Sequence, residues 1–170
     1  MAEAYTLYKL IVLYMLKKVD FPLTTSQISE FILEKGYTSY FKLQETLSEM
    51  EKSALIEAEA THNRTLYHLT TLGKETIQFF QDNISPAIQK DIDDFLAEKE
   101  YDLKEESSVK SDYYMNINHE YEVRCQIIEN GFSLIDLKIS VPTEKEAAAI
   151  SDRWTSQGQE IYHLLLTKLL

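Results

Sequence analysis

The 170-residue chain is 44% hydrophobic and 26% charged, the proportions of an ordinary folded protein. It is long enough to form one large domain or two small ones. Its single cysteine, Cys125, excludes an internal disulfide and a cysteine-based zinc cage. The longest apolar run, Leu10–Leu16, is too short to span a bilayer, and the first residues lack the pattern of a signal peptide. We therefore expect a cytoplasmic protein.

The net charge of −11 argues against a general nucleic-acid-binding coat, which would be basic. The charge is unevenly distributed along the chain. Residues 1–84 hold 8 Lys and Arg against 11 Asp and Glu, a net of −3, whereas residues 85–170 hold 9 against 17, a net of −8. If one part of the chain contacts DNA, it is therefore the first half.

A helix that is apolar around most of its circumference is predicted near the N-terminus. Its apolar residues are Leu7, Leu10, Ile11 and Tyr14, widened by Tyr8, Val12 and Met15. Such a helix is buried on more than one side, which indicates either a central position in the domain or a dimer seam.

Two more helices follow and complete a helix-turn-helix pattern. Thr24 or Thr25 is expected to cap the second helix, and Gly36 is expected to end it. The third helix is predicted within residues 39–56. The inward side chains of the two helices are predicted to be Ile28, Phe31 and Ile32, then Leu43, Leu47 and Met50.

Two short strands are predicted around the polar tip at residues 61–65, and a fourth helix follows them. Its apolar positions are Leu72, Ile77 and Phe80. Three helices, a strand, a tip, a second strand and a helix follow the order of a winged helix. We therefore expect residues 1–84 to form a winged-helix domain.

The second half is predicted to be an α-β-β-β-α module over residues 85–170. A helix begins at Ser85 and Pro86, and residues 107–141 alternate in the manner of three antiparallel strands. Asn130 and Gly131 form a strong hairpin signal. Thr143 and Glu146 form a capping box at the start of a last helix, in which Gly158 indicates a kink or a close packing contact.

No set of residues predicts catalysis, a cofactor or a metal site. The histidines lack metal-ligand spacing, and we expect them to lie at the polar surface, with only His62 and His68 able to face each other across the hairpin. Cys125 is expected to be a buried packing residue, because Arg124, its neighbour along the strand, points to the opposite face. We therefore predict that the protein is not an enzyme.

A winged helix places its third helix in the major groove, where donors to phosphates and base edges are needed. With Leu43, Leu47 and Met50 turned inward, Glu45 and Glu49 are also expected on the outer face, where they would repel phosphates. The residues predicted to contact DNA from this helix, the hairpin tip and the flank are Ser39, Lys42, Thr46, Asn63, Arg64 and Lys74. So few cations per subunit predict DNA binding only by an oligomer.

Residues 5–83 resemble bacterial winged-helix transcription regulators of the PadR-like and MarR-like groups. The segments that carry the resemblance are TSYFKLQETLSEMEKSALIE, ATHNRTLYHLT and TTLGKE. Over its whole length the chain resembles an uncharacterised bacterial family, a domain of unknown function. The resemblance implies a winged helix, gene regulation and a homodimer.

The sequence therefore predicts an α+β protein that binds double-stranded DNA as a homodimer and regulates transcription. Residues 85–170 would dimerise or sense a small-molecule or protein effector. The alternative is a winged-helix module for protein interactions that does not bind DNA, which the net charge and the two glutamates favour.

Overall fold

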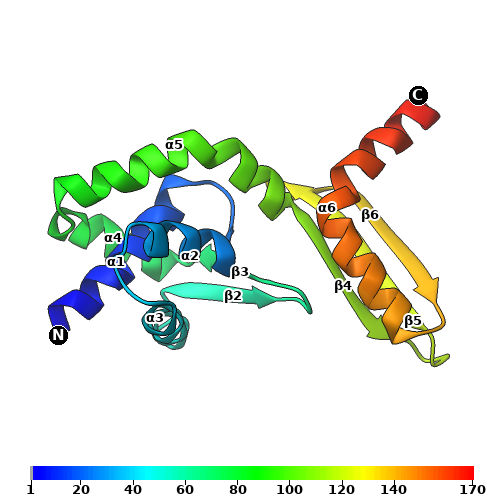
Figure 1. Ribbon diagram of the computed structural model, residues 1–170, viewed down its shortest axis with the longest axis horizontal. Coiled ribbons are helices and arrows are strands. Elements are labelled where there is room, and N and C mark those ends of the chain that lie inside the picture. The colour runs from blue at the N-terminus through cyan, green and yellow to red at the C-terminus, as the bar shows by residue number, and fades with distance from the viewer. Residues whose placement is uncertain (1) are drawn as a thin grey trace. The chain divides into compact units, whose positions relative to one another are not determined.

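The computed structural model of the protein describes residues 2–170, with side chains from Thr6 onward. Six α-helices and two three-stranded antiparallel sheets make up the described chain, which is therefore mixed α+β (Figure 1). The chain forms two compact units. The first contains Met1–Ala60 and Thr65–Leu103, and the second contains Thr61–Arg64 and Lys104–Leu170.

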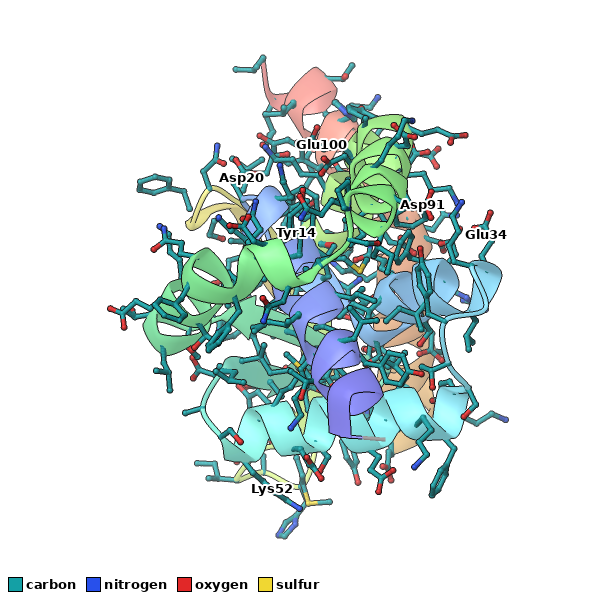
Figure 2. The ribbon with its side chains drawn as sticks, turned by 90° about the vertical axis from the view of Figure 1, so that its left-hand side faces the viewer. Tyr14, Asp20, Glu34, Lys52, Asp91 and Glu100 are labelled. Carbon is teal, nitrogen blue, oxygen red and sulfur yellow. The ribbon has the colours of Figure 1, made fainter. Side chains whose placement is uncertain are left out.

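The first unit surrounds helix α1. Its elements are α1 (Ala2–Lys18), β1 (Leu23–Thr24), α2 (Thr25–Glu34), α3 (Tyr40–Lys52), β2 (Ile56–Ala60), β3 (Thr65–Leu69), α4 (Thr71–Phe80), the short 3-10 helix η1 (Gln81–Asn83) and most of α5 (Pro86–Ser108). Every residue from Leu10 to Leu16 is at most 5% exposed. Tyr14, in the middle of the unit (Figure 2), donates a hydrogen bond to Asp93 of α5 at 3.1 Å. The apolar circumference of α1 is thus covered within its own unit, the central position that the sequence offered as one of two interpretations.

Helix α5 supplies a further part of this core. Ile92, Phe95 and Leu96 are buried against residues of α1 and α2 in one cluster. Gln27 completes a capping box with Thr24 at the start of α2, and its amide nitrogen donates to the backbone oxygen of Leu103 at 3.1 Å. The first unit therefore continues beyond residue 84 to Leu103.

The sheet of the first unit has the strand order β1-β3-β2. Strand β1 pairs with β3 through Leu23 and Tyr67, and β2 pairs with β3 from Ile56–Leu69 to Ala60–Thr65. Strand β1 could not be predicted from the sequence, because two residues after a proline carry no alternating pattern. Of the apolar positions of α4, Leu72 and Phe80 are 48% and 42% exposed, while Gly73 and Ile77 form the buried side.

The second unit contains a three-stranded antiparallel sheet, as predicted. Its elements are the end of α5, β4 (Val109–Met115), β5 (Tyr121–Glu129), β6 (Phe132–Val141) and α6 (Glu144–Leu169). Asn130 and Gly131 both have positive φ and join β5 to β6, and Thr143 and Glu146 form the capping box of α6. Both features agree with the sequence analysis.

One face of this sheet is covered by α6. Val123, Cys125 and Ile127 are fully buried against Ala147 and Trp154. The indole nitrogen of Trp154 donates to the backbone oxygen of Gln126 at 3.1 Å, which fixes the ring on the sheet. A Cβ on Gly158 would lie 3.1 Å from both the Trp154 ring and the Val109 side chain. The glycine therefore marks a close packing contact, one of the two possibilities that the sequence indicated.

Candidate nucleic-acid interface

The first turn of α3 is the most exposed part of the helix. The hydroxyl of Ser39 caps the helix by accepting a hydrogen bond from the backbone nitrogen of Lys42 at 3.3 Å. Tyr40 and Phe41 are 57% and 76% exposed. The ammonium of Lys42 lies 3.4 Å from the carboxylate of Glu45, a surface ion pair that contributes little stability. Ser39 and Lys42 are therefore both accessible to a ligand.

The buried side of α3 is wider than the sequence analysis assumed. Leu43, Leu47 and Met50 are buried as predicted. Thr46 is also completely buried, and its hydroxyl donates to the backbone oxygen of Lys42 at 2.8 Å. Thr46 is about 40° from Met50 around the helix axis, so it lies within the apolar arc. The prediction that Thr46 faces outward is wrong.

The two glutamates of α3 have different surroundings. The carboxylate of Glu49 forms an ion pair with the ammonium of Lys9 in α1, with the nitrogen and oxygen 3.0 Å apart. Glu45 remains exposed beside Lys42. One of the two expected repulsive carboxylates is therefore held between helices, and the other is next to a cation.

The hairpin tip Thr61–Arg64 belongs to the second compact unit. One amino group of Arg64 donates to the backbone oxygen of Glu106 at 2.7 Å, and the other is buried without a partner among the described residues. Burial lowers the pKa of Arg64, and the nearby carboxylate of Glu106 opposes this change. The guanidinium is thus directed to protein, although the sequence predicted a phosphate contact.

The neighbours of Arg64 at the tip are also engaged within the second unit. The amide nitrogen of Asn63 donates to the hydroxyl of Thr155 at 3.4 Å. The ring of His62 stacks on Tyr113 with centroids 3.9 Å apart, and a ring nitrogen bonds to Asp112. Burial alone would raise the pKa of Asp112, but hydrogen bonds from His62 and from the backbone lower it.

The sequence allowed His62 and His68 to face each other across the hairpin, but in the structure His68 is paired with Glu57. It bonds to Glu59 across the hairpin, with the ring nitrogen and the carboxylate oxygen 3.0 Å apart. This contact lies within the first unit.

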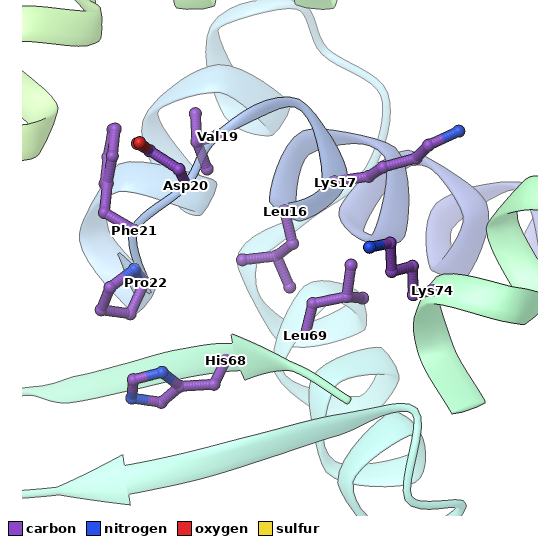
Figure 3. A pocket seen from close by; sticks show the side chains of 9 residues that line it. All are labelled: Leu16, Lys17, Val19, Asp20, Phe21, Pro22, His68, Leu69 and Lys74. Atoms are coloured by element: carbon purple, nitrogen blue, oxygen red, sulfur yellow. The ribbon is translucent and has the colours of Figure 1, made fainter. Parts of the chain in front are cut away.

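Lys74, the last predicted DNA contact, lines a hollow in the first unit with a volume of about 280 Å³ (Figure 3). Lys17 lies at the same hollow, and its ammonium donates to the side-chain oxygen of Gln81 at 2.8 Å. Lys17 could not be identified from the sequence, because 57 positions separate two lysines that only the tertiary structure brings to one hollow. Exposed Phe41 was not predicted either, although an aromatic residue outside the apolar stripe of a helix is a usable signal.

Neither a cluster of metal ligands nor an accessible thiol is present among the described residues. No group of three or more His, Cys, Asp or Glu residues is arranged there to hold a metal ion. Cys125 is fully buried, and burial raises the pKa of its thiol to about 11. Among the described helices, none combines the length and apolar character that crossing a bilayer requires.

Comparison with known protein families identifies the family of this chain. A family described as a domain of unknown function, DUF4364, matches residues 8–169. The chain belongs to the DUF4364 family. The DUF4364 match spans parts of both compact units, and it confirms the resemblance to an uncharacterised family. No curated protein and no solved structure matches the chain significantly.

Proposed function

We propose that the protein is a DNA-binding regulator of transcription that acts as a homodimer through a winged helix in its first unit. The observation that carries this proposal is the strand order β1-β3-β2, in which the hairpin strands follow α3 and the strand before α2 pairs with the returning strand. Helices α1, α2 and α3 with this sheet have the order of elements of a winged helix. The topology supports the fold more specifically than the order of helices and strands alone.

The start of α3 would enter the major groove. In helix-turn-helix proteins the residues near the N-terminus of the recognition helix contact the bases. Ser39 and Lys42 lie there, at the end of the helix that carries partial positive charge. Thr46 takes no part, and Arg64 takes none while it is bound to Glu106. DNA contact therefore depends on α3 more than the sequence analysis proposed.

A single subunit offers too few cations for firm binding, so the proposal requires a dimer. Each phosphate contact contributes about −0.9 to the slope of log affinity against log salt, and two subunits double the number of contacts. Exposed leucines lie at the end of α6, where Leu166, Leu169 and Leu170, spaced three and four residues apart, are 37%, 78% and 101% exposed. Contiguous exposed apolar residues mark interaction surfaces. We assign the dimer contact to this end of α6, because residues Leu10–Leu16 of α1 are already buried.

A protein-interaction module is the second candidate function. Tyr40 and Phe41 project from the first turn of α3, and Phe41 is 76% exposed. Exposed aromatic residues are typical anchors of protein interfaces. The net charge of −11 and the carboxylate of Glu45 beside Lys42 would also suit a protein partner better than DNA.

Recovery of bound fragments from the DNA of the source organism separates the two candidates. The purified protein is incubated with fragmented DNA at about 50 and about 200 mM salt, the range over which phosphate contacts weaken. The proposal predicts enriched sites at low salt that are lost with Lys42→Ala and kept with Lys90→Ala, a change at an exposed lysine of α5. No enrichment by folded protein at low salt would contradict DNA binding and favour the protein-interaction module.

A further inference from the structure

The hollow beside Lys74 lies entirely within the first unit and has two chemically different sides. Its walls come from the end of α1, the link from α1 to β1, the end of β3 and the first turns of α4. Leu16, Pro22 and Leu69 provide apolar surface (Figure 3). Polar groups lie beside this surface, so the hollow combines the apolar walls and few charged groups that are typical of small-molecule sites.

Two lysines line the hollow. Among the described residues, none accepts a hydrogen bond or ion pair from the exposed ammonium of Lys74. Lys17 is bonded to the neutral amide of Gln81, so this contact leaves its charge uncompensated. Figure 3 shows the Lys74 ammonium directed toward Leu16 and Leu69, whereas the Lys17 side chain extends away from them.

The acidic groups leave one net positive charge at the hollow. Asp20 lines it, but Figure 3 shows its carboxylate on the side away from the two lysines. His68 also lines the hollow and is bonded to Glu59, whose carboxylate is not among the lining groups. Two lysines minus one aspartate give +1, in a chain whose net charge is −11. A monoanion therefore matches this local charge.

We propose that the hollow binds a small organic acid. Its carboxylate would accept a hydrogen bond from the ammonium of Lys74, and its apolar body would lie on Leu16 and Leu69. The volume of about 280 Å³ is close to the lower end of the range for small-molecule sites, so it suits a compact ring or branched chain.

A carboxylate fits better than a phosphate. Phosphate sites usually combine arginine forks or backbone nitrogens of glycine-rich loops, and the residues lining the hollow include neither arginine nor glycine. A doubly charged phosphate would also exceed the local charge of +1. Binding of the organic acid does not require DNA, since every residue that would contact the acid lines the hollow.

Nuclear magnetic resonance titration of the full chain with three probes tests the site without changing the fold. Benzoate carries both the ring and the carboxylate, benzamide retains the ring without the charge, and acetate retains the charge without the ring. Benzoate is expected to shift the backbone amide signals of residues 16–21 and 68–74. It is expected to bind about tenfold more tightly than either other probe, because each lacks half of the contacts. Equal affinity for acetate and benzoate, or shifts confined to other residues, would overturn the proposal.

A pair of lysine variants locates the carboxylate. Lys74→Met keeps most of the side-chain length and removes the charge, and it should weaken benzoate binding about tenfold. Lys90→Met changes an exposed lysine of α5 and should leave the affinity unchanged. Equal benzoate affinity of the Lys74→Met variant and the unmodified protein would overturn the assignment. Because DNA is absent from this titration, its outcome is independent of the proposed regulation.

Discussion

At the scale of single residues, Arg64 determines how much the hairpin tip can contribute to ligand binding. Its guanidinium bonds to the backbone oxygen of Glu106 in the second unit. Hydrogen bonds from charged groups contribute more than neutral ones, so Arg64→Ala should lower the free energy of unfolding of this unit by about 1 to 2 kcal/mol. Denaturant unfolding followed by the fluorescence of Trp154, the single tryptophan of the chain, measures the change.

The control for this prediction is Arg153→Ala, which removes an exposed arginine of α6. It should change the unfolding free energy by less than about 0.5 kcal/mol. An Arg64→Ala variant that unfolds like the unmodified protein but binds DNA more weakly would show instead that Arg64 is a phosphate contact.

The buried thiol of Cys125 makes the stability of the folded protein depend on pH in the alkaline range. Its pKa rises from the ordinary value of 9.0 to about 11 in the folded protein because the thiol is buried. Between these values the unfolded chain has lost the proton and the folded protein retains it, so stability falls as pH rises from about 9 to about 11. Denaturant unfolding at several pH values should show this decrease, and Cys125→Ala should reduce it. An identical pH dependence in the variant would contradict the assignment.

At the scale of elements, Gly73 allows α4 to approach the link between α3 and β2 at Leu55. A Cβ at this position would lie 2.1 Å from the backbone oxygen of Leu55 and 2.9 Å from a methyl carbon of Leu69. Because a backbone oxygen cannot move aside cheaply, Gly73→Ala should destabilise the protein by about 3 kcal/mol or more. Thermal unfolding followed by far-ultraviolet circular dichroism measures the effect.

Gly158→Ala is the matched control, since it is also a glycine-to-alanine change within a helix. Its Cβ would meet only side chains, at 3.1 Å. The gain in helix propensity of about 1 kcal/mol offsets part of this crowding, so a small net change is expected. If both substitutions lowered the unfolding temperature equally, the backbone contact at Gly73 would not be the cause of its larger expected effect.

Local patterns predicted most elements, and long-range contacts account for the differences. The Asn130–Gly131 turn and the Thr143–Glu146 capping box depend on neighbouring residues, so they could be predicted from sequence. Strand β1 exists because Leu23 pairs with Tyr67, and no local pattern reports that pairing. The predicted DNA contacts differ from the structure for the same reason. The partner of Arg64 is 42 residues away, and Thr46 was placed outside an apolar arc whose width depends on how α3 packs.

At the scale of the whole molecule, the account requires a homodimer formed by the exposed leucines of α6. Leu169→Glu would place a charge in that contact and should convert the dimer to a monomer, as measured by size-exclusion chromatography with light scattering. Leu72→Glu places the same charge at a residue of α4 that is 48% exposed, and it should leave the dimer intact. A monomeric unmodified protein would contradict this part of the account.

The salt dependence of binding to a recovered DNA fragment tests whether α3 contacts DNA. With one Lys42 contact to phosphate from each subunit, Lys42→Ala should reduce the slope of log affinity against log salt by about 2. Lys90→Ala should leave the slope unchanged. If affinity and slope are the same with and without Lys42, or if no fragment is bound at low salt, then α3 is not the DNA-contacting helix and the proposed function is wrong.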